Sequence, residues 1–428
     1  MHSMVDGRLA AAVAATPASR LLPQRSQARA ELLIGEAEVL DALELGGDSW
    51  LAIVEFGDRR IVCPGTIKGN EFNRQPEVAS RLRAGDFGAF RVELPGGALG
   101  ARTVKAIDVD QTNDSVICDG VVIKWQLDAA PSPAARALRA VADASVTPPV
   151  RALVEWTDSS GQVCTLATAA EFLEGAEDGW TWAVDVVRAH ARGEVVDAIG
   201  PFAQLGEMTA RMHVALAGLG VEKLDAAACS ALADSASAAL DEAVSVTGGD
   251  EGRRLRGRST FLHQRIAGLR AISTTPVMAI HGDLHVGQVL RSPDGALSII
   301  DFDGNPLLTP AERMLPAPPA RDVAGMLASI DHVARVVNFR TDRLDPRPAL
   351  VWIAHAQEAF LASYQQTLNA AGRRELLDDR LLAPFLIEQE CREYIYAAKH
   401  LPHWVYVPDA VISEYPVDGV DSSESDAN

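Results

Sequence analysis

The stretch that decides the fold is His281-Gly282-Asp283-Leu284-His285-Val286-Gly287-Gln288, followed shortly by Ile299-Ile300-Asp301-Phe302-Asp303. Asp283 stands five residues before the amide of Gln288, and Asp301 closes an apolar run thirteen residues after that amide. A carboxylate, an amide and a second carboxylate supply one proton acceptor and two oxygen ligands of the kind that Mg²⁺ prefers. The spacing therefore predicts a site at which a hydroxyl loses its proton beside a divalent cation.

The same order of groups is typical of phosphoryl transfer. In protein kinases a catalytic Asp precedes a metal-binding Asn by five residues, and a later Asp-Phe-Gly supplies a second metal ligand. Gln288 stands in the Asn place, and Asp301-Phe302-Asp303 stands in the place of Asp-Phe-Gly. We therefore predict Asp283 as catalytic base, Gln288 and Asp301 as magnesium ligands, and Asp303 as a further metal contact. The alternatives are a turn-capping role for Asp283 and a surface carboxylate for Asp303.

Length and composition limit the class of protein. The chain has 428 residues, more than one small core accommodates, so two or three domains or lobes are expected. Acidic residues outnumber basic ones 58 to 39, giving a net charge of −19, which argues against nonspecific binding to nucleic acid or anionic membranes. No apolar run approaches the roughly 18 residues that span a bilayer, and no convincing signal peptide is present, so we expect a cytoplasmic protein.

The N-terminal part of the chain is β-rich. Residues 50–56 and 90–94 have strand composition, and Asp119-Gly120 between two β-branched runs predicts a hairpin. A second hairpin is expected around residues 158–161. Lys124 then lies on an inner strand, in an apolar run where an unpaired ammonium would be costly. It is the candidate for contacting nucleotide phosphates, and a lysine that reaches solvent from an edge strand is the alternative.

Two further segments are candidates for nucleotide binding. Asn113 and Ser115 belong to a turn that precedes the first hairpin and could cap phosphates with backbone amides. The chain changes from strand to helix character near residues 167–176, where we expect a hinge between two lobes. Glu171 and Leu173 lie in this hinge and are predicted nucleotide contacts.

The remainder is predominantly helical. Apolar residues recur at three- and four-residue spacing from Trp182 onward, and further helices are expected at about 320–370 and 380–400. The proline-rich run before Arg321-Asp322 predicts a helix start. This charged pair could support the floor of the site or reach the substrate.

The segment from Glu388 to Trp404 is unusually polar and aromatic for a helix. Gln389 and Glu393 are four residues apart and share a helix face. Polar groups beside aromatic planes suit a sugar, and a carboxylate suits a cationic amino group, with a charge-assisted hydrogen bond contributing roughly 1.5–3 kcal/mol. A solvated face of Glu–Arg pairs is the alternative. The candidate substrate contacts are Asp283, His285, Arg321, Asp322, Gln389, Glu390, Glu393 and Tyr394.

Several stretches resemble the actinobacterial maltokinases, which are eukaryotic-like kinases related to the aminoglycoside phosphotransferases. These stretches are His281–Arg291, Asp301–Pro306, Glu312-Arg313, Arg321–Met326, Glu171–Trp180 and Tyr396–Trp404. The resemblance covers about residues 110–405. It implies an α+β, bilobal kinase fold with a β-rich N-terminal cap and N-lobe and a mostly α-helical C-lobe, using ATP and Mg²⁺. By this resemblance Asp283 is the base, Gln288 and Asp301 are metal ligands, and Lys124 is the nucleotide lysine.

The domain boundaries that we expect follow from this resemblance and from the change in sequence character. Residues 1–110 would form the cap and intermediate subdomain, and 111–175 the rest of the N-lobe with its lysine and hinge. Residues 176–417 would form the helical C-lobe with the catalytic loop and sugar site. Residues 418–428 are acidic and Ser-rich, and we expect them to be a disordered tail.

Departures from the maltokinase pattern bear on the substrate. The metal strand reads Asp-Phe-Asp-Gly-Asn-Pro where maltokinases usually have Asp-Phe-Glu-Gly-Glu-Pro, and Gln389 replaces a usual Lys. These changes are similar to a sister group of kinases that phosphorylate glucosamine at the 6-hydroxyl, which is our prediction. Maltose 1-phosphorylation and an aminoglycoside-type phosphotransferase are the alternatives.

One further alternative comes from a different class of protein. The helix after Lys124 lacks the Glu that usually pairs with that lysine. This absence is the sole support for a kinase-like binding protein without catalysis. We expect a small amino sugar as the partner, no nucleic acid, no membrane, and a monomer or homodimer.

Overall fold

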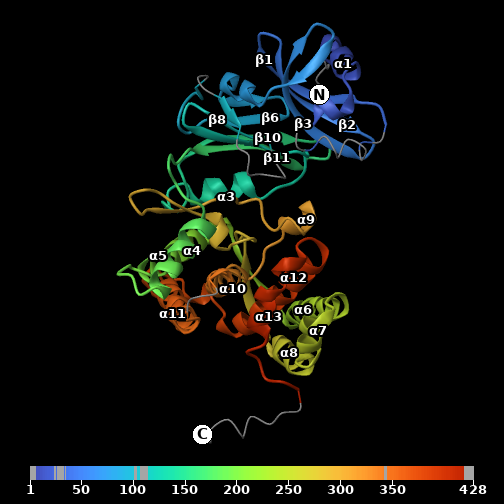
Figure 1. The fold of residues 1–428 in the computed structure, drawn as a ribbon. Helices are drawn as coiled ribbons and strands as arrows, with labels where there is room; N and C mark the ends of the chain where they lie inside the picture. Colours follow the sequence, from blue (N-terminus) through green and yellow to red (C-terminus); the bar gives the residue numbers. More distant parts are fainter. Residues whose placement is uncertain are drawn as a thin grey trace, which may run out of the picture. The chain divides into compact units, whose positions relative to one another are not determined.

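A computed structural model of the chain describes residues 6–23, 26, 33, 35–100, 104–106, 114–341 and 345–418 (Figure 1). The chain forms two compact units, which we call the β-rich unit (Met1–Gly175 with Phe302–Met314) and the helical unit (Ala176–Asp301 with Leu315–Asn428). The division at Gly175 falls inside the expected hinge segment. The segment Phe302–Met314 groups with the β-rich unit, whereas the sequence predicts it in the C-terminal part.

The β-rich unit begins with a small helix-covered sheet. Two helices, α1 (Gly7–Ala14) and α2 (Ala18–Leu21), share a buried core with the four-stranded antiparallel sheet that follows. Its strands lie in chain order and are β1 (Glu38–Gly46), β2 (Ser49–Phe56), β3 (Arg59–Lys68) and β4 (Glu71–Arg74). The predicted strand at residues 50–56 is thereby confirmed.

A second, seven-stranded antiparallel sheet carries the lysine. Its spatial order is β5-β6-β10-β11-β9-β8-β7. The strands are β5 (Gly85–Phe87), β6 (Phe90–Glu93), β7 (Val104–Ala106), β8 (Asp114–Cys118), β9 (Val121–Trp125), β10 (Val150–Thr157) and β11 (Val163–Glu171). Both predicted hairpins are present, and Asp119 and Gly120 adopt the positive φ values, 47° and 74°, that a tight two-residue turn requires.

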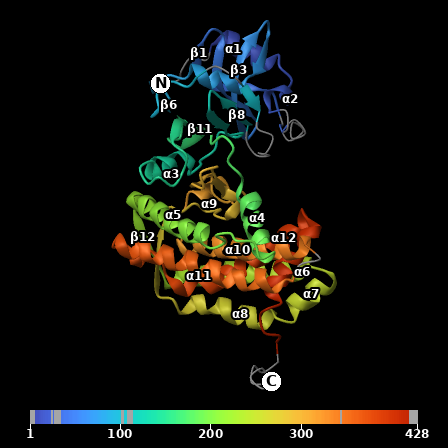
Figure 2. The ribbon, with the colours of Figure 1, turned by 60° about the vertical axis from the view of Figure 1, so that its left-hand side comes forward.

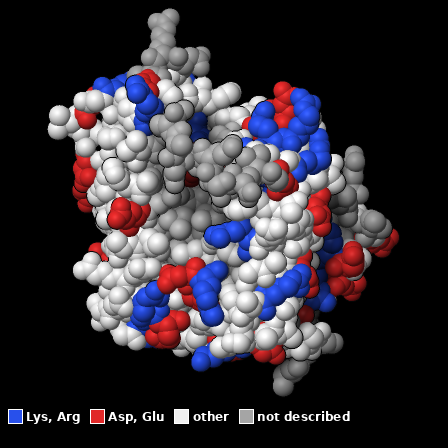
Figure 3. Space-filling view, turned by 90° about the horizontal axis from the view of Figure 1, so that it is seen from below, with Lys and Arg blue, Asp and Glu red and all other residues white. Residues whose placement is uncertain are grey.

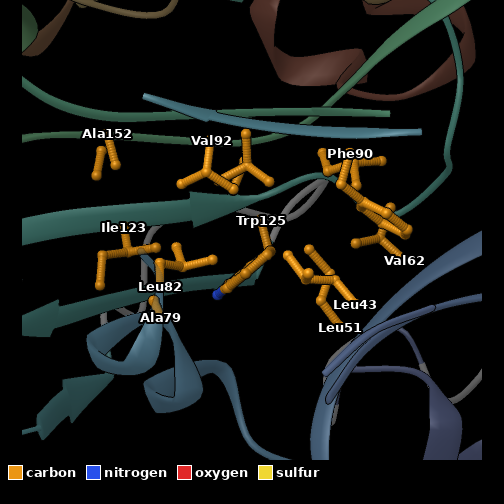
Figure 4. Packing of buried hydrophobic residues seen from close by; sticks show 14 of the residues in the cluster. Leu43, Leu51, Val62, Ala79, Leu82, Phe90, Val92, Ile123, Trp125 and Ala152 are labelled. Carbon is orange, nitrogen blue, oxygen red and sulfur yellow. The ribbon is translucent and has the colours of Figure 1, made fainter. Parts of the chain in front are cut away.

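The position of Lys124 follows from packing between the two sheets. Ile123 and Trp125 of β9 are buried in a core that also contains Leu51 and Val62 of the first sheet (Figure 4). Because successive side chains of a strand point to opposite faces, this burial places Lys124 on the other face of its sheet. Strands β11 and β8 flank β9 on either side, which confirms the predicted inner strand.

The helical unit packs long helices around two short hairpins. The helices are α4 (Gly179–Ala191), α5 (Gly200–Leu216), α6 (Ala226–Val246), α7 (Gly249–Arg256), α8 (Ser259–Ala267), α10 (Ala320–Arg340), α11 (Arg347–Ala370), α12 (Leu382–Lys399) and α13 (Tyr406–Ile412). The hairpins are β12 (Val221–Asp225) with β13 (Thr274–Met278), and β14 (Val289–Arg291) with β15 (Leu297–Ile299). This arrangement confirms the helical character expected from Trp182 onward.

Close packing of α5 against α11 organises one side of this unit (Figure 2). The apolar stripe of α5 is fully buried, with Phe202 and Met212 at 0% exposure. A Cβ on Gly206 would lie 2.1 Å from the carbonyl oxygen of Phe360, so only glycine allows the two backbones to approach this closely.

The helix α10 is buried along most of its length, which suits a helix at the centre of a unit. It begins at Ala320 directly after the proline-rich run, as predicted from the sequence.

On the face seen in Figure 3, basic and acidic side chains alternate in small groups. No helix among the described residues is long and apolar enough to span a bilayer.

Candidate active site

The catalytic-loop residues gather within the helical unit. Asp283 follows β13, and Gln288 ends a 3₁₀ turn (Val286–Gln288) that leads into β14. The hairpin β14–β15 then returns the chain, so that the backbone N–H of Ile300 donates to the carbonyl of Gln288 at 2.9 Å. Asp301, the next residue, is thereby placed beside the loop. This short hairpin explains how residues thirteen positions apart reach the same site.

The Asp283 carboxylate interacts with both of the other groups. Burial raises the pKa of Asp283 to about 6, against the lowering effect of His281, and the negative charges of Asp301 and Asp322 raise it further. The side chain of Gln288 donates a hydrogen bond to the Asp283 carboxylate, which opposes the rise. The predicted base therefore lies within interaction range of both predicted metal ligands.

The donor set fits a divalent cation. Repulsion between the Asp283 and Asp301 carboxylates is the kind of interaction that a bound cation relieves. Gln288 uses its N–H on Asp283, which leaves the amide oxygen to act as a ligand. Asp301 has φ +67°, a strained value for a non-glycine residue, and such strain is retained mainly at functional sites. We propose that Gln288 and Asp301 hold Mg²⁺, which keeps its other positions for water and phosphate.

A buried carboxylate holds the loop in place. Asp322 of α10 accepts the backbone N–H of His281 at 2.7 Å and that of Gly282 at 2.9 Å. His213 of α5 donates from Nε2 to the same carboxylate at 3.0 Å, and its Nδ1 lies 2.7 Å from the hydroxyl of Tyr364. Of the two roles left open for Asp322, the contacts support the floor of the site, because its oxygens are engaged by the loop.

The side chain of His281 ties the loop to the metal strand. Its Nε2 donates to the carbonyl of Ile300 at 2.9 Å, and its Nδ1 accepts the N–H of Asp283 at 3.3 Å. These two bonds join the residue that precedes Asp301 to the residue proposed as base. The geometry between the base and the metal strand therefore depends on one buried imidazole.

Replacing Asp322 with Asn should destabilise the helical unit by about 1.5–3 kcal/mol, since a charged acceptor of three N–H groups is lost. Burial alone would raise the pKa of Asp322, but His213 and the loop backbone lower it. This stabilisation is thus present above the ordinary value of 3.8 and is lost as the pH falls through the lowered pKa. Urea unfolding at pH 7 measures the effect.

The matched control for this variant is Asp185→Asn. It removes an exposed carboxylate of α4 and should change stability by less than about 0.5 kcal/mol. Equal stability of the Asp322 variant and the wild type would contradict the positioning role of Asp322.

His285 is held in the same loop as a neutral acceptor. Its Nδ1 accepts the N–H of Gly287 at 3.0 Å, and the N–H of Val286 donates to the hydroxyl of Ser329 at 2.7 Å. Burial lowers the pKa of His285 to about 4, with His281 and His332 adding to the effect. At neutral pH the ring is uncharged, so it remains a candidate for a hydrogen bond to a sugar hydroxyl rather than for binding an anion.

A second cluster lies on α12 and the segment that follows it. Gln389 donates to Glu393 at 3.1 Å, and the indole N–H of Trp404 donates to the other oxygen of Glu393 at 2.9 Å. Trp180 packs edge-on against Trp404, with ring centroids 5.9 Å apart. A half-buried carboxylate bonded to one indole ring of an edge-on pair is the kind of arrangement predicted for an amino sugar.

The other candidates on α12 are engaged differently. Glu390 is 1% exposed and pairs with His332 at 2.9 Å, and Tyr394 is fully buried with its hydroxyl 3.3 Å from Asp409. Arg321 lies over the ring of Phe385 and pairs with Glu388 at 3.1 Å. The sugar prediction therefore depends mainly on Gln389 and Glu393, while Arg321 joins α10 to α12.

Lys124 has a carboxylate partner within the β-rich unit. Its Nζ lies 2.7 Å from Asp303, which also accepts hydrogen bonds from Gln126 at 3.0 Å and Ser132 at 3.3 Å. The partner therefore comes from the Asp-Phe-Asp segment, and this pairing accounts for the grouping of residues 302–314 with the β-rich unit. In the structure the carboxylate predicted as a further metal contact neutralises the lysine.

The remaining nucleotide candidates are placed as follows. Ser115 lies on β8, directly opposite Lys124 in the strand pairing, so the predicted turn at this position is wrong. Glu171 ends β11 and is exposed, and Leu173 follows it half-buried. Asn113 and residues 419–428 of the predicted tail lie outside the described residues.

Sequence reasoning missed three residues of the site. His213 and Tyr364 support Asp322, and His332 pairs with Glu390 while its ring lies 6.3 Å from that of Trp404. The available signal was a histidine inside an apolar helical stripe, since burial of an imidazole requires hydrogen-bond partners. The identity of those partners depends on tertiary packing.

A model of the "Phosphotransferase enzyme family" matches residues 126–375. The chain belongs to this family. It is 42% identical over 424 residues to a glucosamine kinase of Streptacidiphilus jiangxiensis, covering 94% of this chain and 96% of that protein. It is also 36% identical over 319 residues to a glucosamine kinase of Mycolicibacterium smegmatis, covering 73% and 79% of the two chains.

A solved structure of this family gives the same result for the fold. A glucosamine kinase in complex with glucosamine, ADP and inorganic phosphate superposes with a TM-score of 0.86 at 38% identity, covering 96% of this chain and 99% of that one. The predicted family and the predicted kinase fold, with a β-rich N-terminal part and a mostly helical C-terminal part, are confirmed.

Proposed function

We propose that this phosphotransferase is an ATP-dependent glucosamine kinase that produces glucosamine 6-phosphate. The observation that carries the proposal is the cluster of Asp283, Gln288 and Asp301 in a chain whose relatives over nearly its full length are glucosamine kinases. We also propose that it acts in the cytoplasm, where ATP is available.

The proposed chemistry is a direct transfer of the γ-phosphoryl group. The acceptor hydroxyl gives its proton to Asp283 as its oxygen bonds to the γ-phosphorus, and the bond to the ADP oxygen breaks. Magnesium bound by Gln288 and Asp301 would neutralise charge on the phosphate oxygens. Lys124, held by Asp303, would contact the nucleotide phosphates. Positioning and electrostatics then supply most of the acceleration.

Recognition of the amino sugar would come from Gln389 and Glu393. The Glu393 carboxylate is already oriented by Gln389 and Trp404, so little ordering is needed when a cationic amino group binds. The indole surfaces of Trp180 and Trp404 would contact the apolar face of the sugar ring.

The direct test is a panel of acceptors with ATP and Mg²⁺, followed by ADP release. We expect turnover with glucosamine well above that with glucose, N-acetylglucosamine, maltose or an aminoglycoside, and ³¹P NMR of the product should place the phosphate on oxygen 6. Turnover of maltose alone would eliminate the amino-sugar proposal, and turnover of none would favour a binding protein.

Substituting Glu393 by Gln should reduce kcat/KM for glucosamine by about 10–150-fold, since a charge-assisted hydrogen bond is lost. The reduction for glucose should be much smaller, because its 2-hydroxyl carries no charge. Steady-state kinetics with both sugars measure the ratio. Glu358→Gln, an exposed position on α11, is the matched control and should change neither value. Equal losses of kcat/KM with both sugars would show that Glu393 has a structural role instead.

A further inference from the structure

One face of α10 contacts the catalytic loop along several turns of the helix. The carboxylate of Asp322 and the hydroxyl of Ser329 accept backbone N–H groups of loop residues 281–286. Between them lies Gly325, where a Cβ would sit 2.8 Å from a carbonyl oxygen of the same loop. Residues three or four positions apart share a helix face, so the next residue on this face is His332.

His332 contacts the C-terminal part of the chain. Its Nε2 pairs with Oε1 of Glu390 on α12 at 2.9 Å, and both side chains are almost completely buried. Its ring packs edge-on against the indole of Trp404, with ring centroids 6.3 Å apart and an angle of 85° between the planes. Because Glu390 holds the imidazole, the ring presents a fixed surface to Trp404.

Trp404 connects this ring to the proposed amino-sugar contact. Its indole N–H donates to the Glu393 carboxylate at 2.9 Å. It also packs edge-on against Trp180, with ring centroids 5.9 Å apart. Trp180 lies against the catalytic loop, since a Cβ on Gly287 would sit 3.0 Å from its Nε1. The indole that orients Glu393 is therefore in contact with one ring from α10 and with one ring that packs on the loop.

The pair between His332 and Glu390 is ionic at neutral pH. Burial would lower the pKa of His332, but the charge of Glu390 and the hydrogen bond to it raise this pKa to about 9, with a further contribution from Glu393. The imidazole is therefore protonated. Removing one partner of a buried ion pair is strongly destabilising, so the pair keeps the ring of His332 in one place.

We infer that His332 is a positioning residue for amino-sugar selectivity, because its ring sets the place of Trp404 and, through the indole N–H, that of the Glu393 carboxylate. The imidazole is buried, so it acts through Trp404 and does not touch the sugar. This inference rests on the proposed glucosamine kinase activity. Since α10 also holds the catalytic loop, one helix positions both the loop of the base and the amino-sugar contacts.

Two substitutions of His332 separate its ring from its ion pair. His332→Gln keeps a donor for Glu390 and removes the ring. The ratio of kcat/KM for glucosamine to that for glucose should then fall by about tenfold or more, with KM for ATP unchanged, because a displaced contact is lost in the transition state. His332→Phe keeps a ring beside Trp404 and leaves Glu390 without its partner, so it should lose stability and retain most of the preference for glucosamine.

Steady-state kinetics with both sugars give the ratio, and urea unfolding gives the stability of each variant. Calorimetric titration of glucosamine into the chain saturated with ADP makes the same comparison without turnover, and His332→Gln should weaken this binding by about tenfold or more. The matched control is His355→Gln, the same substitution at an exposed position of α11, which should change neither selectivity nor stability.

An unchanged preference for glucosamine in His332→Gln, or a parallel loss with glucose, would overturn the inference. It would also be overturned if a folded His332→Phe lost the preference as fully as His332→Gln, since the ring would then not matter. If His332→Phe does not fold, the ratio in His332→Gln decides. Failure of the wild type to phosphorylate glucosamine is a different result, which would overturn the proposed function itself.

Discussion

Replacing Asp283 with Asn lowers turnover by about 10²–10⁴-fold, which is the usual contribution of a general base. The amide cannot accept the proton of the sugar hydroxyl, yet it keeps the shape and the hydrogen-bonding side chain beside Gln288. Nucleotide affinity should change little, because binding of ATP does not require proton transfer. Single-turnover kinetics and ADP titration separate the two effects.

The pH profile gives a second readout of the same residue. Since the base must be ionised and burial raises its pKa to about 6, kcat/KM of the wild type should fall as the pH drops through 6. Bound magnesium would move this limb to lower pH. The residual activity of Asp283→Asn should lack this acidic limb. If the limb persists in that variant, a group other than Asp283 titrates.

A stability measurement on the same variant provides an internal check. The raised pKa means that ionised Asp283 opposes folding at neutral pH, so Asp283→Asn should stabilise the ligand-free protein, by at most about 3 kcal/mol. Asp294→Asn, an exposed turn position between β14 and β15, is the matched control and should alter neither turnover nor stability. Full activity of the Asp283 variant would refute its role as base.

Replacing Asp301 with Asn should reduce turnover by about 10³-fold, since a magnesium ion at the phosphates contributes several kcal/mol of charge stabilisation. Asn tolerates the left-handed backbone at φ +67°, so this substitution removes charge without adding strain. The magnesium concentration that gives half-maximal activity should rise at the same time. Titration of Mg²⁺ at fixed ATP measures both quantities.

Two companion variants separate the charge from the backbone. Asp301→Ala removes the ligand and also places a less tolerant residue at a positive φ, so it should lose stability as well as activity. Asp303→Asn should instead weaken nucleotide binding through Lys124 and leave the magnesium requirement closer to that of the wild type. An unchanged magnesium requirement in Asp301→Asn would remove this residue from the metal site.

Local patterns were sufficient for several elements of each unit. The Asp119-Gly120 hairpin and the inner strand with Lys124 follow from turn chemistry and from alternation of buried side chains. The start of α10 follows from the prolines that precede it. In each case the pattern lies in residues adjacent in the sequence, so it can be recognised without knowledge of distant contacts.

Partners from distant parts of the chain were not predictable in this way. The expected Glu partner for Lys124 is absent from the helix α3 (Ala134–Val141), and the structure supplies Asp303, 179 positions later in the sequence. The sequence leaves two roles open for Asp322, and its contacts with the loop and with His213 favour one of them. A side chain's partner depends on which elements pack together, and that information is not local.

By itself the sequence determined which chemical groups stand in order along the catalytic loop and metal strand. The separations of five and thirteen residues are short, so a local turn and one hairpin are enough to bring these groups together. Tertiary structure decided which of the remaining polar residues are exposed to a ligand and which are buried in pairs. Gln389 and Glu390 are neighbours in the chain, yet one lies beside Glu393 and the other against His332. Successive residues of a helix point about 100° apart, so Gln389 and Glu390 face different surroundings. The packing of other elements around the helix decides what each of them contacts.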